Sequence, residues 1–259
     1  MIRKKYNPIM KSKESIVIKI AYLSELRSKL PVESICVNSI YLKEDPGSGE
    51  WTDGKRHHLS LNSERGRRVA KGIRLRMDID RRIKELESYW RTNYKGKIPD
   101  NKDFTVKVSS PCGMNGAFFR RAKQECNDMA HRSSFVYKGI SYRSKNEVIV
   151  AEILDELGLE FKYEPKVVLD NGQIVYPDFL VNIAEADRCF IIEIQGMMND
   201  TKYLTNAIQK ESAYFQHGFR DGKEILFFKS GTDSMDFDAF RLLVEAVTEA
   251  NIKEAFKIS

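Results

Sequence analysis

The hydrophobic positions of the first part of the chain predict a long amphipathic helix after a small mixed region. Between residues 63 and 93, apolar residues recur mostly every three or four positions, which places them on one helical face. These residues are Val69, Ile73, Ile79, Ile83, Leu86 and Trp90. Upstream, alternating apolar and polar positions favour strands at residues 16–20 and 35–42 around a short helix at 23–30. A second short helix is expected at about residues 117–131.

The pattern from residue 133 onward is typical of an α/β unit, in which short apolar runs alternate with helical segments. A hairpin is expected at 135–142, and a helix follows from Ser144 to Gly158, where glycine suits the position after a helix. We predict strands at residues 161–163, 167–169, 174–181, 189–195 and 224–228, and helices at 201–217 and 236–250. Asp170-Asn171-Gly172 supplies a hairpin turn.

Charge divides the chain in the same place. Residues 1–132 contain 29 Lys and Arg against 16 Asp and Glu, whereas residues 133–259 contain 14 against 21. This asymmetry predicts a basic, largely helical N-terminal region (1–132) that binds nucleic acid and an acidic C-terminal domain (133–259). The candidate phosphate contacts lie on the polar face of the long helix: Arg65, Arg67, Arg68, Lys71, Arg74, Arg81 and Arg82. An ordinary solvated basic face explains the same pattern, so both interpretations stay open.

Other broad classes of protein fit the chain poorly. No apolar run approaches the roughly 20 residues that span a bilayer, and no apolar signal core follows the basic N-terminus. Four scattered cysteines do not form a disulfide scaffold. We therefore expect a cytoplasmic protein without a membrane partner.

Three separated acids carry the candidate chemistry. Asp178 follows Tyr176-Pro177, Glu193 lies in the apolar run 190–196, and Glu147 opens the helix that starts after Ser144. A buried carboxylate is costly unless something compensates its charge. Two acids on adjacent strands would share a hard divalent cation, which prefers carboxylate and carbonyl oxygens. Such a site suits metal-assisted hydrolysis of a phosphodiester.

The order of these motifs resembles the PD-(D/E)xK nuclease superfamily, across about residues 135–230. The run Phe161-Lys162-Tyr163-Glu164-Pro165, after Ser-x-x-Glu and a helix, is similar to endonuclease subunits of heteromeric transposases and related phage enzymes. The resemblance implies a restriction-endonuclease-like mixed sheet flanked by helices and a DNA endonuclease that leaves 5′-phosphate and 3′-hydroxyl ends. It also implies Mg²⁺, with Mn²⁺ as a substitute. The metal ligands would be Asp178, Glu193 and the Ile194 carbonyl, with Glu147 binding directly or through water.

Gln195 departs from the family pattern, which has a lysine at this position. Glutamine carries no positive charge and cannot act as a base. The next helix offers a replacement in Lys210, which shares one face with Tyr203, Ala207 and Tyr214. We therefore predict that Lys210 is catalytic, supported by Gln195, Tyr203 and Tyr214, with Lys202 as the next candidate.

Several alternatives stay open at this point. The chain could be a catalytically inactive DNA-binding or assembly protein that keeps the nuclease fold. It could instead act on RNA, or work only as a homodimer or with a protein partner such as a transposase.

Overall fold

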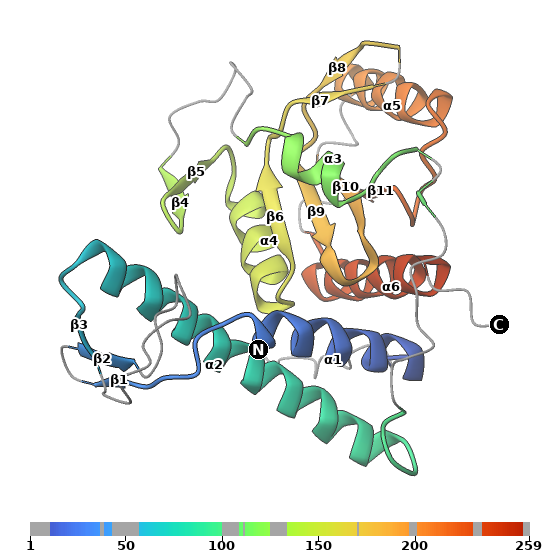
Figure 1. The fold of residues 1–259 in the computed structure, drawn as a ribbon. Coiled ribbons are helices and arrows are strands. Elements are labelled where there is room, and N and C mark those ends of the chain that lie inside the picture. The colour runs from blue at the N-terminus through green and yellow to red at the C-terminus, as the bar shows by residue number, and fades with distance from the viewer. Residues whose placement is uncertain are drawn as a thin grey trace, which may run out of the picture. The chain divides into compact units, whose positions relative to one another are not determined.

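The computed structural model describes residues 11–36, 39–42, 57–99, 109–110, 112–124, 134–169, 171–196, 201–229 and 235–255 (Figure 1). The chain divides into two compact units, a first unit of Lys13–Asp103 and a second unit of Met1–Ser12 with Phe104–Ser259. The functional division after residue 132 stays a prediction. In the part of the chain that the structure describes, no helix is long and apolar enough to cross a membrane.

In its described residues, the first unit combines two helices with a three-stranded antiparallel sheet. Helix α1 (Lys13–Ser28) packs against α2 (Glu64–Asn93), and the sheet has the order β1 (Ile35–Cys36), β2 (Ser39–Leu42), β3 (His57–Ser60). The predicted strand at 16–20 is therefore wrong, because these residues belong to α1. Tertiary packing has overridden the β preference of their Ile and Val side chains.

The long helix of the first unit begins and faces its core as the sequence predicted. The Ser63 hydroxyl accepts a hydrogen bond from the Gly66 N–H at 2.9 Å and caps the first turn. Val69, Ala70 and Ile73 pack with Ile40 from the sheet. The apolar face of α2 is thereby buried, and its basic face is left at the surface.

The second unit is a mixed four-stranded sheet with the order β11-β10-β9-β6. Strand β10 (Arg188–Gln195) runs parallel to β11 (Ile225–Lys229) and antiparallel to β9 (Phe179–Ile183), which in turn pairs with β6 (Glu160–Tyr163). This arrangement agrees with the predicted mixed α/β class. The predicted hairpin is also present as β4 (Phe135–Tyr137) and β5 (Ile140–Tyr142).

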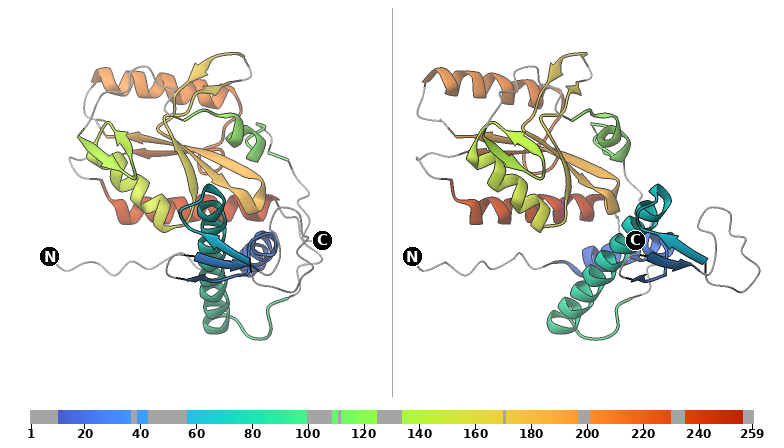
Figure 2. Two further views of the ribbon diagram at one scale, coloured as in Figure 1. Left: turned by 60° about the vertical axis from the view of Figure 1, so that its left-hand side comes forward. Right: turned by 90° about the vertical axis from the view of Figure 1, so that its left-hand side faces the viewer.

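Helices cover the two faces of this sheet (Figure 2). Helices α4 (Lys145–Glu156) and α6 (Phe237–Ala255) lie on one face, and α5 (Thr201–Gln216) lies on the other. The alternation along β11 reflects this division, because Phe227 packs against Tyr214 of α5 and Phe228 packs against Phe240 of α6. Helix α3 (Gly116–Arg121) packs on β9 and β10, and so belongs to the second unit. It is shorter than predicted, and residues 125–131 of the prediction lie outside the described residues.

The predicted strand at 174–181 is divided into two. Residues Ile174–Val175 form β8, which pairs with β7 (Val167–Val168) in a separate hairpin, whereas β9 begins at Phe179 in the main sheet. Pro177 lies in the break, because proline cannot donate a hydrogen bond to a ladder. The break leaves Asp178 just outside the first residue pair of β9. Asn171 and Gly172 lie between the two hairpin strands as predicted, while Asp170 is outside the described residues.

Candidate active site

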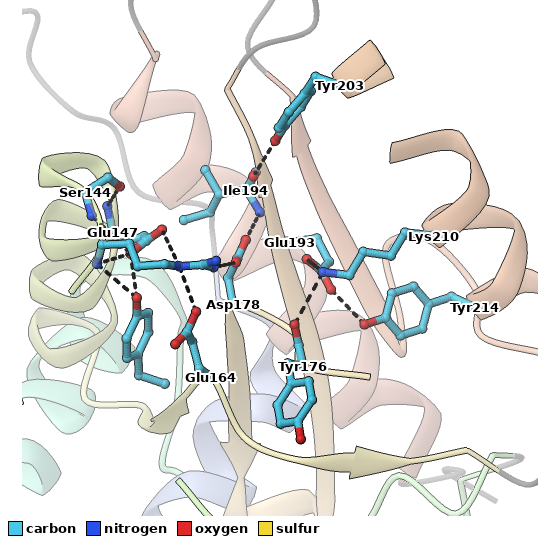
Figure 3. Close-up of polar contacts among 12 residues, drawn as sticks. Ser144, Glu147, Glu164, Tyr176, Asp178, Glu193, Ile194, Tyr203, Lys210 and Tyr214 are labelled. Carbon is cyan, nitrogen blue, oxygen red and sulfur yellow. Dashed lines mark hydrogen bonds and ion pairs between the residues drawn. The ribbon is translucent and has the colours of Figure 1, made fainter. Parts of the chain in front are cut away.

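A cleft of about 580 Å³ opens where the N-terminus of α4, the segment before β9, the end of β10 and one face of α5 meet. It brings together most of the residues that the sequence singled out. Those lining it are Glu147, Asp178, Glu193, Ile194, Gln195, Tyr203 and Lys210. Figure 3 shows the polar contacts of Glu147, Asp178, Glu193, Ile194, Tyr203 and Lys210.

Glu193 is the most deeply buried acid of the cleft. It shares a face of β10 with Ile191, which belongs to the core that also includes Tyr214 of α5. The Lys210 ammonium lies 2.6 Å from Glu193 Oε2, and the Tyr214 hydroxyl donates a hydrogen bond to Oε1 at 2.7 Å. Burial raises the pKa of Glu193 to about 7, even though the Lys210 charge opposes that rise.

Lys210 approaches Glu193 as the spacing along α5 predicted. Its side chain is 37% exposed, and it also donates a hydrogen bond to the Tyr176 carbonyl at 3.4 Å. Partial burial disfavours its charge, but the Glu193 and Asp178 carboxylates outweigh this effect and raise the pKa of Lys210. Lys210 is therefore a fixed cation at the wall of the cleft. The catalytic role that the sequence assigned to it stays a prediction.

Asp178 lies next to Glu193 because of the strand register. Ile192 pairs with Phe179, so Glu193 and Asp178 follow as the next opposed positions, on the same side of the sheet. The Ile194 N–H donates a hydrogen bond to Asp178 Oδ2 at 2.7 Å. The Asp178 charge also contributes to the raised pKa of Glu193. The two acids are therefore electrostatically coupled.

Glu147 has a structural role in the first turn of α4. Its Oε2 atom accepts hydrogen bonds from the Ser144 N–H and from the Tyr163 hydroxyl, the latter at 2.7 Å. The contact with the Ser144 N–H, together with the Glu147 N–H that donates to the Ser144 hydroxyl, forms a capping box. Burial raises the pKa of Glu147. Oε2 thus has its partners within the fold, whereas Oε1 lies 3.9 Å from the Nε atom of Arg143.

Two charged residues of this region were missed by the sequence interpretation. Arg143 lines the cleft, and its Nε atom lies 2.7 Å from Oε1 of the buried Glu164, while Nη2 donates to Asp178 Oδ1 at 3.0 Å. Arg143 directly precedes the cap residue Ser144, and Glu164 is part of the run 161–165. Their pairing depends on tertiary contacts, and no local spacing signals it.

The remaining predicted site residues have weaker contacts. The Tyr203 hydroxyl donates a hydrogen bond to the Ile194 carbonyl at 3.4 Å. Gln195 is 4% exposed, and its Oε1 atom has no hydrogen-bond partner within the described part of the chain. A buried amide oxygen without a partner is costly and suits a ligand such as water. The side chain of Lys202 lies outside the described residues.

The donor set fits a hard divalent cation. Asp178, Glu193 and Ile194 all line the cleft, and carboxylate and carbonyl oxygens are the ligands that Mg²⁺ prefers. Among the residues that the structure describes, no group of three or more His, Cys, Asp and Glu side chains forms a ready-made site. This is compatible with Mg²⁺, which usually keeps several waters and is held by one or two carboxylates.

The predicted nucleic-acid contacts lie on α2, in the first unit. Arg65, Arg67, Arg68, Lys71 and Arg74 are exposed, and Arg82 is half-buried. Arg81 is exposed but lies 2.5 Å from Asp78, so part of its charge is already compensated within the helix. Among the predicted contacts, the exposed ones other than Arg81 therefore lie in the N-terminal half of α2.

Comparison of the chain with models of known families, with curated proteins and with solved structures finds no match.

Proposed function

We propose that the chain is a metal-dependent endonuclease with a restriction-endonuclease-like core, which hydrolyses phosphodiester bonds of DNA. The observation that carries this proposal is the position of Lys210, whose ammonium lies 2.6 Å from Glu193 in the cleft that Asp178 also lines. A lysine from α5 supplies the positive charge that Gln195 cannot provide. Two coupled acids would hold the cation, and the adjacent lysine would stabilise charge that develops on the phosphate.

Asp178, Glu193 and the Ile194 carbonyl would hold Mg²⁺, with Mn²⁺ as a substitute. The bound cation would activate a water molecule and neutralise charge on the scissile phosphate. Lys210, fixed by Glu193, stabilises the charge that develops on the phosphate oxygens. Glu147 orients water through Oε1, and Gln195 contributes a buried hydrogen-bonding group. The exposed arginines of α2 bind the phosphate backbone without sequence preference.

A nicking assay on supercoiled plasmid tests the proposal. Wild-type protein is expected to nick or linearise the plasmid in Mg²⁺ or Mn²⁺ and to be inactive in excess chelator. Asp178→Asn and Glu193→Gln, which keep the shape of each side chain, are expected to abolish cleavage. Lys138→Met is a suitable control, because Lys138 forms an exposed ion pair with Asp155 and does not line the cleft. Cleavage in chelator, or full activity of either acid variant, would contradict the proposal.

A non-catalytic DNA-binding protein with the same fold is the second candidate. It is favoured by the pairing of both acids with side-chain cations, Asp178 with Arg143 and Glu193 with Lys210. This alternative predicts binding without cleavage in both metals. Duplex, branched and single-stranded DNA, and RNA, should each be assayed. Activity that appears only after a partner protein is added would identify a subunit of a larger nuclease.

A further inference from the structure

The guanidinium of Arg143 lies between two acids of different character. Its Nε atom is 2.7 Å from Glu164 Oε1, and its Nη2 atom donates to Asp178 Oδ1 at 3.0 Å. Asp178 lines the cleft, whereas Glu164 is 1% exposed and is not one of its lining residues. Asp178 is therefore the acid of the pair that borders the cleft, and Glu164 holds the arginine from the buried side.

The backbone fixes Glu164 in this anchoring position. Its N–H donates a hydrogen bond to the Asp178 carbonyl at 3.0 Å, so the two acids are joined through the main chain as well as through Arg143. Glu164 has a φ of 43°, a left-handed backbone conformation that residues other than Gly and Asn rarely adopt. Such strain persists only where the surrounding structure holds the residue in place.

Arg143 retains capacity for a ligand. A guanidinium has five N–H donors in a planar fork, and the contacts with Glu164 and Asp178 engage only the Nε and Nη2 groups. The side chain is 37% exposed and borders the cleft. A fork of this kind matches the geometry of a phosphate group.

Charge balance indicates when Arg143 would change partner. Without a metal, Lys210 pairs with Glu193, whereas Arg143 is shared between Asp178 and Glu164, with Glu147 Oε1 also 3.9 Å from its Nε atom. A divalent cation bound to Asp178 would neutralise the carboxylate that attracts Arg143. The cation would also repel the Arg143 guanidinium. A phosphodiester in the cleft would then take the place of Asp178 beside Arg143, while Glu164 keeps the arginine in position.

We propose that Arg143 is an exchangeable cation, which neutralises Asp178 in the metal-free protein and binds the scissile phosphate once the metal takes Asp178. Glu164 is its positioning residue. This inference rests on the proposed endonuclease function and adds a phosphate-binding residue to it. It also implies that metal and DNA bind cooperatively, because each favours the same position of Arg143.

Two titrations test the proposal. Calorimetry measures Mg²⁺ binding without DNA, and fluorescence anisotropy measures binding of a short DNA duplex with Ca²⁺ in place of Mg²⁺. Arg143→Gln is expected to bind Mg²⁺ roughly tenfold more tightly than wild type, because the competing charge is absent. Its Kd for the duplex is expected to rise roughly tenfold, the scale of one charge-assisted hydrogen bond.

Arg220→Gln is a closely matched control. The Arg220 side chain is 41% exposed, and its Nη2 atom lies 2.6 Å from Oε1 of Glu224, which is 1% exposed. Arg220 does not line the cleft. It is expected to change neither titration. Arg143→Lys keeps a charge and removes the fork, so it should bind Mg²⁺ like wild type and the duplex more weakly. This second variant keeps the test informative if Arg143→Gln does not fold.

The outcomes separate this inference from the proposed function. If wild type cleaves DNA but Arg143→Gln matches Arg220→Gln in either titration, the inference is wrong and the endonuclease proposal stands. If wild type does not cleave, yet Arg143→Gln shows both expected changes, Arg143 has its proposed role in a non-catalytic protein. If wild type and Arg143→Gln both fail to bind Mg²⁺, both proposals are overturned.

Discussion

Replacing Lys210 with methionine should destabilise the second unit in a way that depends on pH. The substitution removes the ammonium 2.6 Å from Glu193 Oε2 and leaves a carboxylate whose side chain is only 4% exposed. Breaking a buried ion pair by removing one partner costs roughly 3–5 kcal/mol. Because 37% of the Lys210 side chain is exposed to solvent, the cost should be smaller, about 2 kcal/mol at pH 8.

The pH dependence follows from the pKa of Glu193. In the folded protein this pKa is about 7, above its ordinary value of 4.5. Between these values the folded chain keeps a proton that the unfolded chain has released, so stability falls as pH rises through this window. The pKa difference of about 2.5 corresponds to about 3 kcal/mol. Without Lys210 the folded pKa rises further, so Lys210→Met should continue to lose stability above pH 7.

The free-energy difference between Lys210→Met and wild type should therefore be near zero at pH 5 and largest at pH 8. Hydrogen exchange of the β9 and β10 amides, measured across a urea titration, reports the stability of this sheet. Tryptophan fluorescence does not, because Trp51 and Trp90 both belong to the first unit.

Lys138→Met provides the comparison at an exposed site. The Lys138 Nζ atom lies 2.6 Å from Asp155 Oδ1, the same distance as in the buried pair. The Lys138 side chain is 62% exposed and the Asp155 side chain is 41% exposed. Exposed pairs of this kind contribute less than about 1 kcal/mol. The reasoning about the buried pair would be refuted in two cases. The free energy of unfolding lost in Lys210→Met could be independent of pH, or it could be no larger than the free energy lost in Lys138→Met.

Two further predictions concern activity and binding. Reversing the charges of Arg67, Arg68 and Arg74 together should weaken DNA binding and flatten the dependence of log Kd on log salt concentration. Fluorescence anisotropy at several salt concentrations measures this slope. An unchanged slope would place the DNA contacts elsewhere. Lys210→Ala should lower the cleavage rate roughly 10²–10³-fold with little change in substrate binding, and adding Gln195→Lys should restore part of that rate. Equal single-turnover rates for wild type and Lys210→Ala would rule out a catalytic role for this lysine.

The local sequence pattern was sufficient to predict most helices and strands of the second unit and part of the candidate site. The serine cap placed the start of α4, and the spacing along α5 placed Lys210 and Tyr214 on the face that meets Glu193. These features depend on residues within a few positions of one another, or on the regular geometry of one helix.

Features that depend on distant contacts could not be predicted in this way. The strand expected at 16–20 is helical, because packing in the first unit decides the conformation of a segment rich in β-branched residues. Arg143 was missed because its partner Asp178 is 35 residues away, so their contact exists only in the assembled sheet. The division of residues 174–181 between two sheets likewise reflects tertiary pairing, although Pro177 was a local sign of a bend.

The two contacts of α5 with Glu193 have a consequence for how such sites are recognised in sequences. Lys210 and Tyr214 are one helical turn apart, and each holds a different oxygen of the same carboxylate. Under the proposed function, the positive charge that the family pattern places two positions after the strand acid comes instead from the following helix. A search limited to Glu-x-Lys passes over such an arrangement. The pattern Glu-x-Gln followed in the next helix by Lys-x-x-x-Tyr describes it, and chains that carry this pattern can be screened for the same geometry.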